Sequence, residues 1–152
     1  KTVFGIASTV GDFSILWHIT GLLYAIGSMH RLHQAIALPI ALGAESIIVN
    51  QGVKRIFRRE RPTVSGDDRF DVRTPSTSSF PSGHASSATF AAIILIWMTG
   101  FPLAILWIIM AGVVALSRVV VRIHHLSDIV GGVITGAVLG AIAVPIISSI
   151  LG

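Results

Sequence analysis

Five long apolar stretches, joined by short polar connections, divide this sequence. A helix rises about 1.5 Å per residue and needs about 20 apolar residues to cross the hydrocarbon core of a bilayer. Each stretch is that long or nearly so. The stretches are at about 13–30, 34–53, 82–100, 102–121 and 126–150. The pattern predicts an all-α fold, a polytopic transmembrane helix bundle of about five helices.

The fifth stretch has two features of its own. It is longer than one crossing needs and contains Pro145, which predicts a tilt, a kink or an early end of the helix. Small residues spaced along a membrane helix let a neighbouring helix approach closely. Glycines recur along it at Gly131, Gly132, Gly136 and Gly140. We interpret these glycines as packing positions.

The polar residues between the stretches are predicted to gather on one side of the membrane. Lys54 ends the second helix, Pro81 starts the third, Arg118 ends the fourth, and 124–128 starts the fifth. Antiparallel crossings bring these four helix ends to the same surface. The opposite surface receives the C-terminus and the short turns at 28–33 and 99–102. One surface is therefore expected to be reactive and the other nearly bare.

Composition supports a membrane protein and narrows its partners. Of 152 residues, 53% are hydrophobic and 12% are charged, whereas a soluble domain has about 25% charged residues. The net charge of +4 could indicate nucleic acid. Because the basic residues lie at helix ends, phosphate headgroups of membrane lipids are the expected partner and nucleic acid is not. The oligomeric state cannot be read from the sequence.

The chain holds no cysteine, so disulfides and thiolate chemistry are excluded. Its connections leave little room for a second domain, and we expect one integral-membrane domain over residues 1–152. The first residue is Lys1, not Met. We therefore expect that the natural N-terminus is missing.

The first polar group lies after the second apolar stretch. Six residues separate Lys54 from Arg61, and Pro62 biases Arg61 toward an extended conformation. Arginine offers a planar fork to phosphate oxygens, and lysine offers a mobile point charge. The alternative is a basic anchor at the membrane edge, which stays open for Lys54 and Arg61. We favour that anchor for Arg55, Arg58 and Arg59.

The second group, Pro81 to His84, is predicted to open the third helix. Free N–H groups in a first helical turn point toward an anion, and Gly83 lets the backbone approach a phosphate closely. Ser82 adds a hydroxyl, and His84 can carry a proton near neutral pH. The alternative is an ordinary helix cap.

The third group joins Arg118 to a pair of histidines and an acid. Asp128 lies four residues after His124, and this spacing on a helix lets a carboxylate orient one imidazole nitrogen while the other acts as a nucleophile. His125, three residues before Asp128, is a rival on periodicity alone. The alternative is a histidine–aspartate pair that only neutralises a buried charge.

Taken together, these groups resemble the signature motifs of the type 2 phosphatidic acid phosphatase family. The resemblance rests on Lys54 with Arg61-Pro62, on Pro81 to His84, and on Ser117-Arg118 with His124 and Asp128. All three motifs are complete, in order and in register, and the resemblance spans about residue 12 to the C-terminus. The family spacing selects His124 over His125.

The resemblance implies a metal-independent phosphatase that acts through a phosphohistidine and needs no cofactor. His124 would attack phosphorus, Asp128 would orient it, and His84 would protonate the leaving alkoxide and then activate water. The groups that would hold the phosphate oxygens are Lys54, Arg61, Ser82, Gly83 and Arg118. Zinc is not expected, because the histidines and the aspartate have these other tasks.

The expected substrate is a lipid phosphate or pyrophosphate: phosphatidate, phosphatidylglycerol phosphate or a polyprenyl pyrophosphate. Alternatives are a lipid phosphotransferase with a non-water acceptor, and a catalytically silent lipid-binding or transport bundle. The resemblance implies six helices, of which the first is missing here, and a multi-pass protein of the cell membrane with an extracytoplasmic active site. A count of Lys and Arg would instead place the 54–80 loop in the cytoplasm.

The remaining acids lie outside these motifs. Glu45 falls inside the second apolar stretch, nine residues before Lys54, and a carboxyl group within a membrane segment is a functional hypothesis by default. It is expected to line a substrate channel, to pair with a cation, or to be protonated in a helix contact. Asp12 is expected to cap the first helix. The expected solvated loop charges are Asp67, Asp68 and Asp71.

Overall fold

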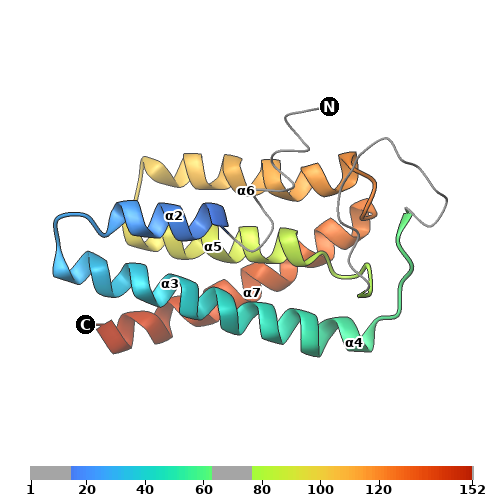
Figure 1. The fold of residues 1–152 in the computed structure, drawn as a ribbon, viewed down its shortest axis with the longest axis horizontal. Helices are drawn as coiled ribbons and strands as arrows, with labels where there is room; N and C mark the ends of the chain where they lie inside the picture. The colour runs from blue at the N-terminus through green and yellow to red at the C-terminus, as the bar shows by residue number, and fades with distance from the viewer. Residues whose placement is uncertain (1–14, 63–76, 152) are drawn as a thin grey trace.

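The computed structural model describes residues 15–62 and 77–151, and every regular element in these ranges is helical. In chain order the elements are α2 (Ile15–Tyr24), α3 (Met29–Ile47), the π-helical η2 (Ile48–Val53), α4 (Lys54–Ile56), α5 (Gly83–Thr99), α6 (Leu103–Val120) and α7 (Leu126–Leu151). Figure 1 shows these helices side by side along the long axis of the molecule. The acids expected as a cap or as loop charges, Asp12, Asp67, Asp68 and Asp71, lie outside the described residues.

The predicted all-α bundle is confirmed, and each of the five predicted stretches corresponds to a helical segment. Within residues 15–62 and 77–151, three helical spans are long and apolar enough to cross a membrane: Met29–Ile56, which joins α3, η2 and α4, then α6 and α7. The 17 residues of α5 form a shorter apolar helix. The described part of α2 is 10 residues long.

One detail of the prediction was wrong. The first turn, expected at 28–33, lies at 25–28, because Ser28 has the extended backbone of an N-cap and α3 already begins at Met29. Polar residues there suggested a turn, but they occupy the exposed first turns of a helix. Pro145 does not end α7, which continues to Leu151.

The core is built around α5, which packs against α3, α6 and α7. Its closest approach is to α7, along the predicted glycine positions. A Cβ at Gly132 would lie 2.5 Å from the Ser82 carbonyl oxygen, and one at Gly136 would collide with the Ser86 carbonyl oxygen. One row of α7 therefore packs closely against α5, as small residues allow.

Apolar side chains on the opposite side of α7 face outward. Every fourth residue along this side of α7 is a large aliphatic residue whose side chain is at least half exposed. The row consists of Val130, Ile134, Val138, Ile142, Ile146 and Ile150. Such an exposed apolar stripe is suited to lipid rather than water.

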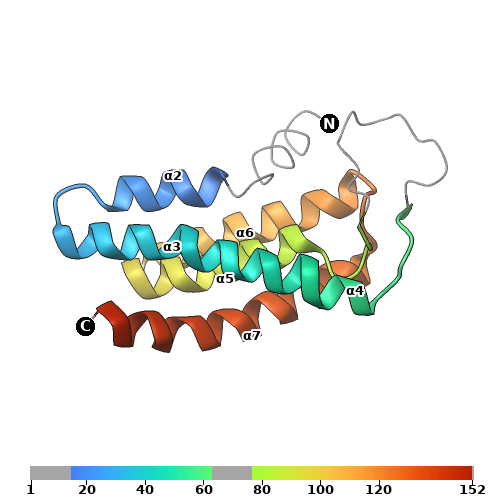
Figure 2. The ribbon, with the colours of Figure 1, turned by 60° about the horizontal axis from the view of Figure 1, so that its bottom comes forward.

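The helix ends divide the molecule into two unlike poles. At the right of Figure 1 lie α4, the start of α5, the end of α6 and the start of α7, and Figure 2 shows the same grouping after rotation. The turn between α2 and α3, the turn between α5 and α6, and the C-terminal end lie at the left. The predicted single polar surface is thus present as one end of the bundle.

Candidate active site

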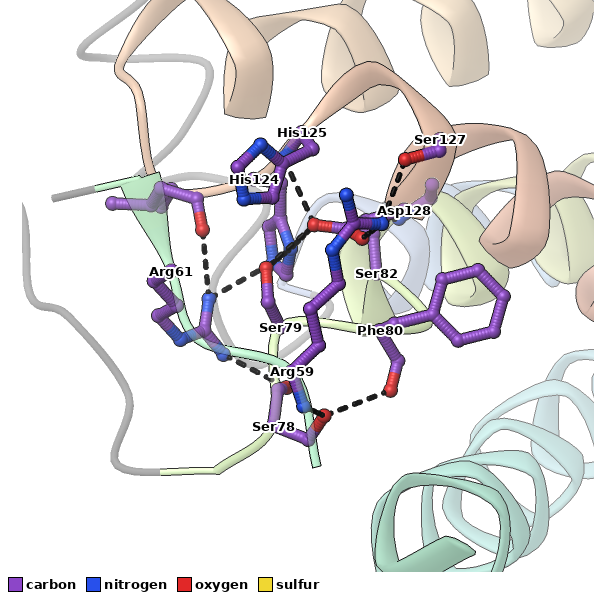
Figure 3. Close-up of polar contacts among 12 residues, drawn as sticks. Arg59, Arg61, Ser78, Ser79, Phe80, Ser82, His124, His125, Ser127 and Asp128 are labelled. Carbon is purple, nitrogen blue, oxygen red and sulfur yellow. Dashed lines mark hydrogen bonds and ion pairs between the residues drawn. The ribbon is translucent and has the colours of Figure 1, made fainter. Parts of the chain in front are cut away.

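Asp128, in the first turn of α7, lies at the centre of the polar end. Its side chain is fully buried. One carboxylate oxygen, Oδ2, accepts the Ser79 hydroxyl at 2.5 Å and the backbone N–H of His125 at 2.8 Å. The other, Oδ1, pairs with Arg59 Nη1 at 2.8 Å, as Figure 3 shows. A carboxylate held by this many donors has little freedom to rotate.

His124 is held between this carboxylate and a guanidinium. Its Nδ1 lies 3.5 Å from Asp128 Oδ2 and 3.4 Å from Ser79 Oγ. Its Nε2 lies 3.1 Å from Arg61 Nη1. Because a guanidinium offers only N–H donors, Nε2 must present its lone pair in this contact, and the ring proton is assigned to Nδ1.

The surroundings of His124 also keep its ring neutral. The side chain is buried, and Arg61, Lys54 and Arg118 bring positive charge close to it. Burial first, and then these cations, hold the pKa of the His124 ring well below its ordinary value. A neutral ring with its proton on Nδ1 leaves Nε2 able to act as a nucleophile.

The two histidines differ in what they offer to Asp128. His124 presents its ring, whereas His125 reaches the same carboxylate through its backbone N–H. Asp128 thus serves as a helix cap as well, since it lies three residues after the donor at the start of α7. Of the two histidines, His124 is thus the one whose ring lies beside Asp128.

Arg61 lies on an extended segment that leaves α4. Its guanidinium donates to three backbone carbonyl oxygens, those of Thr77, Ser78 and Ile123, at 3.0 to 3.3 Å. The remaining contact is the one to His124. Arg61 is therefore fixed by main chain from both neighbouring connections, with one donor directed at the ring nitrogen.

Arg59 corrects the sequence interpretation, which treated it as a membrane-edge anchor. Its Nη1 pairs with Asp128 and also donates to Ser127 Oγ at 2.7 Å. Arg61, two residues further along the segment that follows α4, contacts the His124 ring. Arg59 and Arg61 therefore both reach the site.

Lys54, at the start of α4, is also buried at the polar end. A Cβ at Gly83 would lie 3.3 Å from Lys54 Nζ and 3.4 Å from Asn50 Oδ1. The absence of a side chain at Gly83 thus leaves room for the ammonium group beside the start of α5. Ser82 is the N-cap of α5: its hydroxyl accepts the Ala85 N–H at 3.4 Å. The Ser82 N–H donates to the Asp128 carbonyl oxygen at 2.9 Å.

His84 and Arg118 complete the predicted set. His84 lies in the first turn of α5 and is half-buried. Arg118, near the end of α6, is 1% exposed, and its carbonyl oxygen accepts the backbone N–H groups of Ile123 and His124 at 3.2 Å. The connection from α6 to α7 therefore folds back over Arg118 and carries His124 with it.

Ser79 is the main residue that sequence reasoning missed. It is fully buried and contacts both Asp128 and the His124 ring. Its backbone N–H donates to the Arg59 carbonyl oxygen at 2.9 Å, so the two loop segments run beside each other. A serine in a Ser- and Thr-rich loop carries no spacing signal. Only its position just before Phe80-Pro81 could have indicated it.

The site is thus a group of cations around a buried imidazole and a buried carboxylate. The positive side chains are those of Lys54 in α4, Arg59 and Arg61 in the segment after α4, and Arg118 near the end of α6. Among the described residues, no group of three or more His, Cys, Asp or Glu side chains is placed to hold a metal ion. Fixed cations around a developing negative charge are the arrangement that stabilises phosphoryl transfer.

Comparison with known sequences gives consistent matches. A family model described as the PAP2 superfamily matches residues 34–150. Decaprenylphosphoryl-5-phosphoribose phosphatase of Mycobacterium tuberculosis is 39% identical over 136 residues, which are 89% of this chain and 73% of that protein. A putative undecaprenyl-diphosphatase of Escherichia coli is 28% identical over 139 residues, covering 91% of this chain and 65% of that protein.

Two crystal structures share the fold. A transmembrane PAP2-type phosphatidylglycerolphosphate phosphatase from Bacillus subtilis superposes with a TM-score of 0.70 and 21% identity, over 98% of this chain and 77% of the other. LpxE of Aquifex aeolicus gives 0.74 and 21%, over 95% and 84%. The helical spans together with this shared fold identify an integral membrane protein.

Proposed function

We propose a reaction for this chain from one premise: the chain belongs to the PAP2 superfamily, whose model matches residues 34–150. It is an enzyme, a phosphoric monoester hydrolase, and an integral membrane protein. The proposal is that residues 1–152 act as one domain that removes phosphate from a lipid phosphate through a phosphohistidine at His124. The observation that supports it most directly is the position of the His124 ring, whose Nδ1 lies beside Asp128 and whose Nε2 contacts Arg61.

An apolar cavity of about 550 Å³ between α3, α5 and α7 supports a lipid substrate. It extends along α3 from His33 to Glu45, a length of about 18 Å at 1.5 Å per residue. Aliphatic side chains of α3 and α7 form most of its wall. We propose that the hydrocarbon tail of the substrate occupies this cavity while its phosphate lies at the polar end.

The named sequence relatives favour a polyprenyl tail. The Mycobacterium tuberculosis protein is named for a decaprenyl substrate and the Escherichia coli protein for an undecaprenyl one. The two crystal structures are 21% identical to this chain, so they support its fold but not the identity of its substrate. We therefore propose a polyprenyl-linked phosphate or diphosphate ahead of phosphatidate and phosphatidylglycerol phosphate.

In the first step, His124 Nε2 attacks phosphorus and the bond from phosphorus to the leaving oxygen breaks. The Nδ1 proton stays with the ring and faces Asp128, whose negative charge stabilises the ring as Nε2 becomes phosphorylated. His84 gives a proton to the departing oxygen. Because Arg61 contacts Nε2 in this structure, its Nη1 donor must turn to a phosphate oxygen when substrate enters.

In the second step, water attacks phosphorus and the phosphorus–nitrogen bond breaks. His84, now without its proton, accepts one from the water, so inorganic phosphate leaves and both histidines return to their starting state. Lys54, Arg61 and Arg118 supply positive charge to the oxygens in both transition states. We assign the Gly83 amide and Ser82 to positioning the same oxygens at the start of α5.

We further propose that the protein lies in the cell membrane with this polar end on the extracytoplasmic side. The shared fold supports a membrane location, and the orientation follows the family resemblance. It can be tested with a cysteine introduced at exposed Arg58 in a chain that otherwise has none. A membrane-impermeant maleimide should label this cysteine in intact cells, and labelling only after lysis would contradict the orientation.

Phosphate release from a panel of lipids tests the function. The panel contains decaprenylphosphoryl-5-phosphoribose, undecaprenyl diphosphate and phosphatidate, each in detergent micelles. We expect His124→Ala to abolish release from every substrate and His125→Ala to retain it, with EDTA leaving the wild-type rate unchanged. Release by His124→Ala at the wild-type rate, or loss with EDTA that a divalent ion restores, would contradict the mechanism.

A further inference from the structure

Glu45 is a buried acid that the proposed reaction does not use. It lies on α3, is 3% exposed, and accepts a hydrogen bond from Ser86 Oγ of α5 at 2.5 Å. Ser86 is itself fully buried, and its carbonyl oxygen lies against Gly136 of α7. The hydrogen bond therefore ties α3 to the closely packed pair of α5 and α7, at the end of the apolar cavity nearest the site.

The burial pattern along this helical span changes between Glu45 and Lys54. The buried residues are Gln34, Leu38, Leu42, Glu45, Val49 and Lys54. Steps of three or four residues keep a stripe on one face of an α-helix. The last step, from Val49 to Lys54, is five residues. In a regular α-helix five residues turn through about 500°, which places Lys54 about 140° away from Val49.

The π-helical turn η2 removes this mismatch. The Lys54 N–H donates to the carbonyl oxygen of Val49, five residues earlier, which is the hydrogen bond of a π-helix. A turn of this kind returns to the same face after about five residues rather than about four. Lys54, and not Val53, is therefore the residue that is buried beside Gly83.

From these contacts we infer that Glu45 is a positioning residue for Lys54. Its hydrogen bond to Ser86 fixes the rotation of α3 against α5, and the π-helical turn carries that rotation to Lys54, so that the ammonium group meets the substrate phosphate. This inference rests on the proposed function only through the assignment of Lys54 to phosphate. The acid acts through its hydrogen bond, so a neutral acceptor of the same shape should replace it.

A double-mutant cycle tests the inference. Glu45→Ala should lower kcat/KM for undecaprenyl diphosphate by roughly ten- to a hundredfold, since small displacements of a positioning group have effects of about this size. Inhibition by orthovanadate, a phosphate mimic, should weaken in parallel. Because both changes act through the same ammonium group, Glu45→Ala should add nothing in a Lys54→Ala background. Glu45→Gln, which keeps the acceptor, should stay within about threefold of wild type.

The outcomes are separable. If Lys54→Ala retains wild-type activity, the proposed phosphate site is wrong, and this inference is wrong with it. If Lys54→Ala is impaired but Glu45→Ala adds its full effect, only the positioning role is wrong. Glu45→Gln as impaired as Glu45→Ala also contradicts the inference. Should Glu45→Ala not fold, Ser86→Ala removes the same hydrogen bond and must show the same dependence on Lys54.

Two glycine deletions on the same helical span test the turn itself. Gly43 and Gly52 are both exposed, and a Cβ at either would meet nothing within 4 Å. Deleting Gly52 leaves four residues from Val49 to Lys54, which a regular α-turn presents on the same face. We expect this deletion to retain most activity, and deletion of Gly43, which rotates Glu45 out of register, to lose about a hundredfold. Equal losses from both deletions would contradict the proposed geometry.

Discussion

Asp128 and Glu45 are both buried acids that accept a serine hydroxyl at 2.5 Å, yet their surroundings differ. Asp128 lies at the polar end with Arg59, the His124 ring and a backbone N–H. Glu45 lies between helices and lines an apolar cavity. The first acid is surrounded by groups suited to chemistry, and the second by groups suited to holding helices in register.

This difference explains why two similar hydrogen bonds are assigned different tasks. Around Asp128 the negative charge matters, because it faces a ring that becomes positive during the reaction. Around Glu45 the hydrogen bond matters, because it links α3 to α5 at a fixed rotation. A substitution that removes the charge of the side chain but keeps its shape should therefore have different effects at the two acids.

The largest expected effect is that of Asp128→Asn. The amide keeps the size of the side chain but removes its charge, and its N–H can force the His124 ring into the tautomer that protonates Nε2. We expect kcat to fall by about 10³-fold or more, as when the acid of a catalytic triad becomes an amide. Phosphate release measured beside the matched change Glu45→Gln checks this. Equal effects at both acids would remove the distinction between them.

A smaller effect is expected at Arg59, which supports Asp128 from a partly exposed position. Its side chain is 41% exposed, so Arg59→Ala should lower kcat by roughly tenfold with little change in KM, as for other groups that orient a catalytic side chain. Arg55→Ala is the matched control, because Arg55 is exposed and its guanidinium donates to Gln51 on the same helical span. Kinetics on undecaprenyl diphosphate distinguish the two. Equal losses of kcat in the two variants would contradict this role and favour a membrane-edge anchor for Arg59.

The sequence was informative about Asp128 and much less so about Arg59. Hydropathy predicted the helices, and their antiparallel crossing of the membrane predicted which helix ends meet. Where α4 ends could not be read, because five of the nine residues from Lys54 to Pro62 are basic and no Gly or Pro precedes Pro62 within this stretch. The helix ends at Ile56, and Phe57 has an extended backbone; that Arg59 and Arg61 both reach the site is known only from their contacts with Asp128 and His124.

Glu45 and Lys54 illustrate a second limit. Nine residues in a regular α-helix turn through about 900°, so sequence periodicity places the two side chains on opposite faces. The π-helical turn at Ile48–Val53 brings both toward α5. The amino-acid sequence of this segment does not predict such a turn. Ser79 was missed for a related reason, since its contacts depend on how two loop segments pair.

The smallest expected effect is a dependence of stability on pH at the Asp128 end. The folded protein holds the pKa of His124 well below its ordinary value of about 6.5, whereas the unfolded chain protonates this ring near that value. Between the two values the unfolded state binds more protons, so lowering the pH from about 7 to about 5 lowers Tm, and raising it restores Tm. Thermal unfolding in detergent should show a smaller shift for His124→Gln. Identical shifts would contradict the neutral, buried ring.

The most direct test of the account is to trap the phosphorylated enzyme. His84→Ala should slow the attack of water more than the first step on undecaprenyl diphosphate, whose leaving group is itself a phosphate that needs little protonation. Rapid quenching in base, which preserves phosphohistidine, followed by peptide mass spectrometry should then find one phosphoryl group on His124. Phosphate on His125, on a serine, or on no residue of an enzyme that still turns over would contradict the central claim.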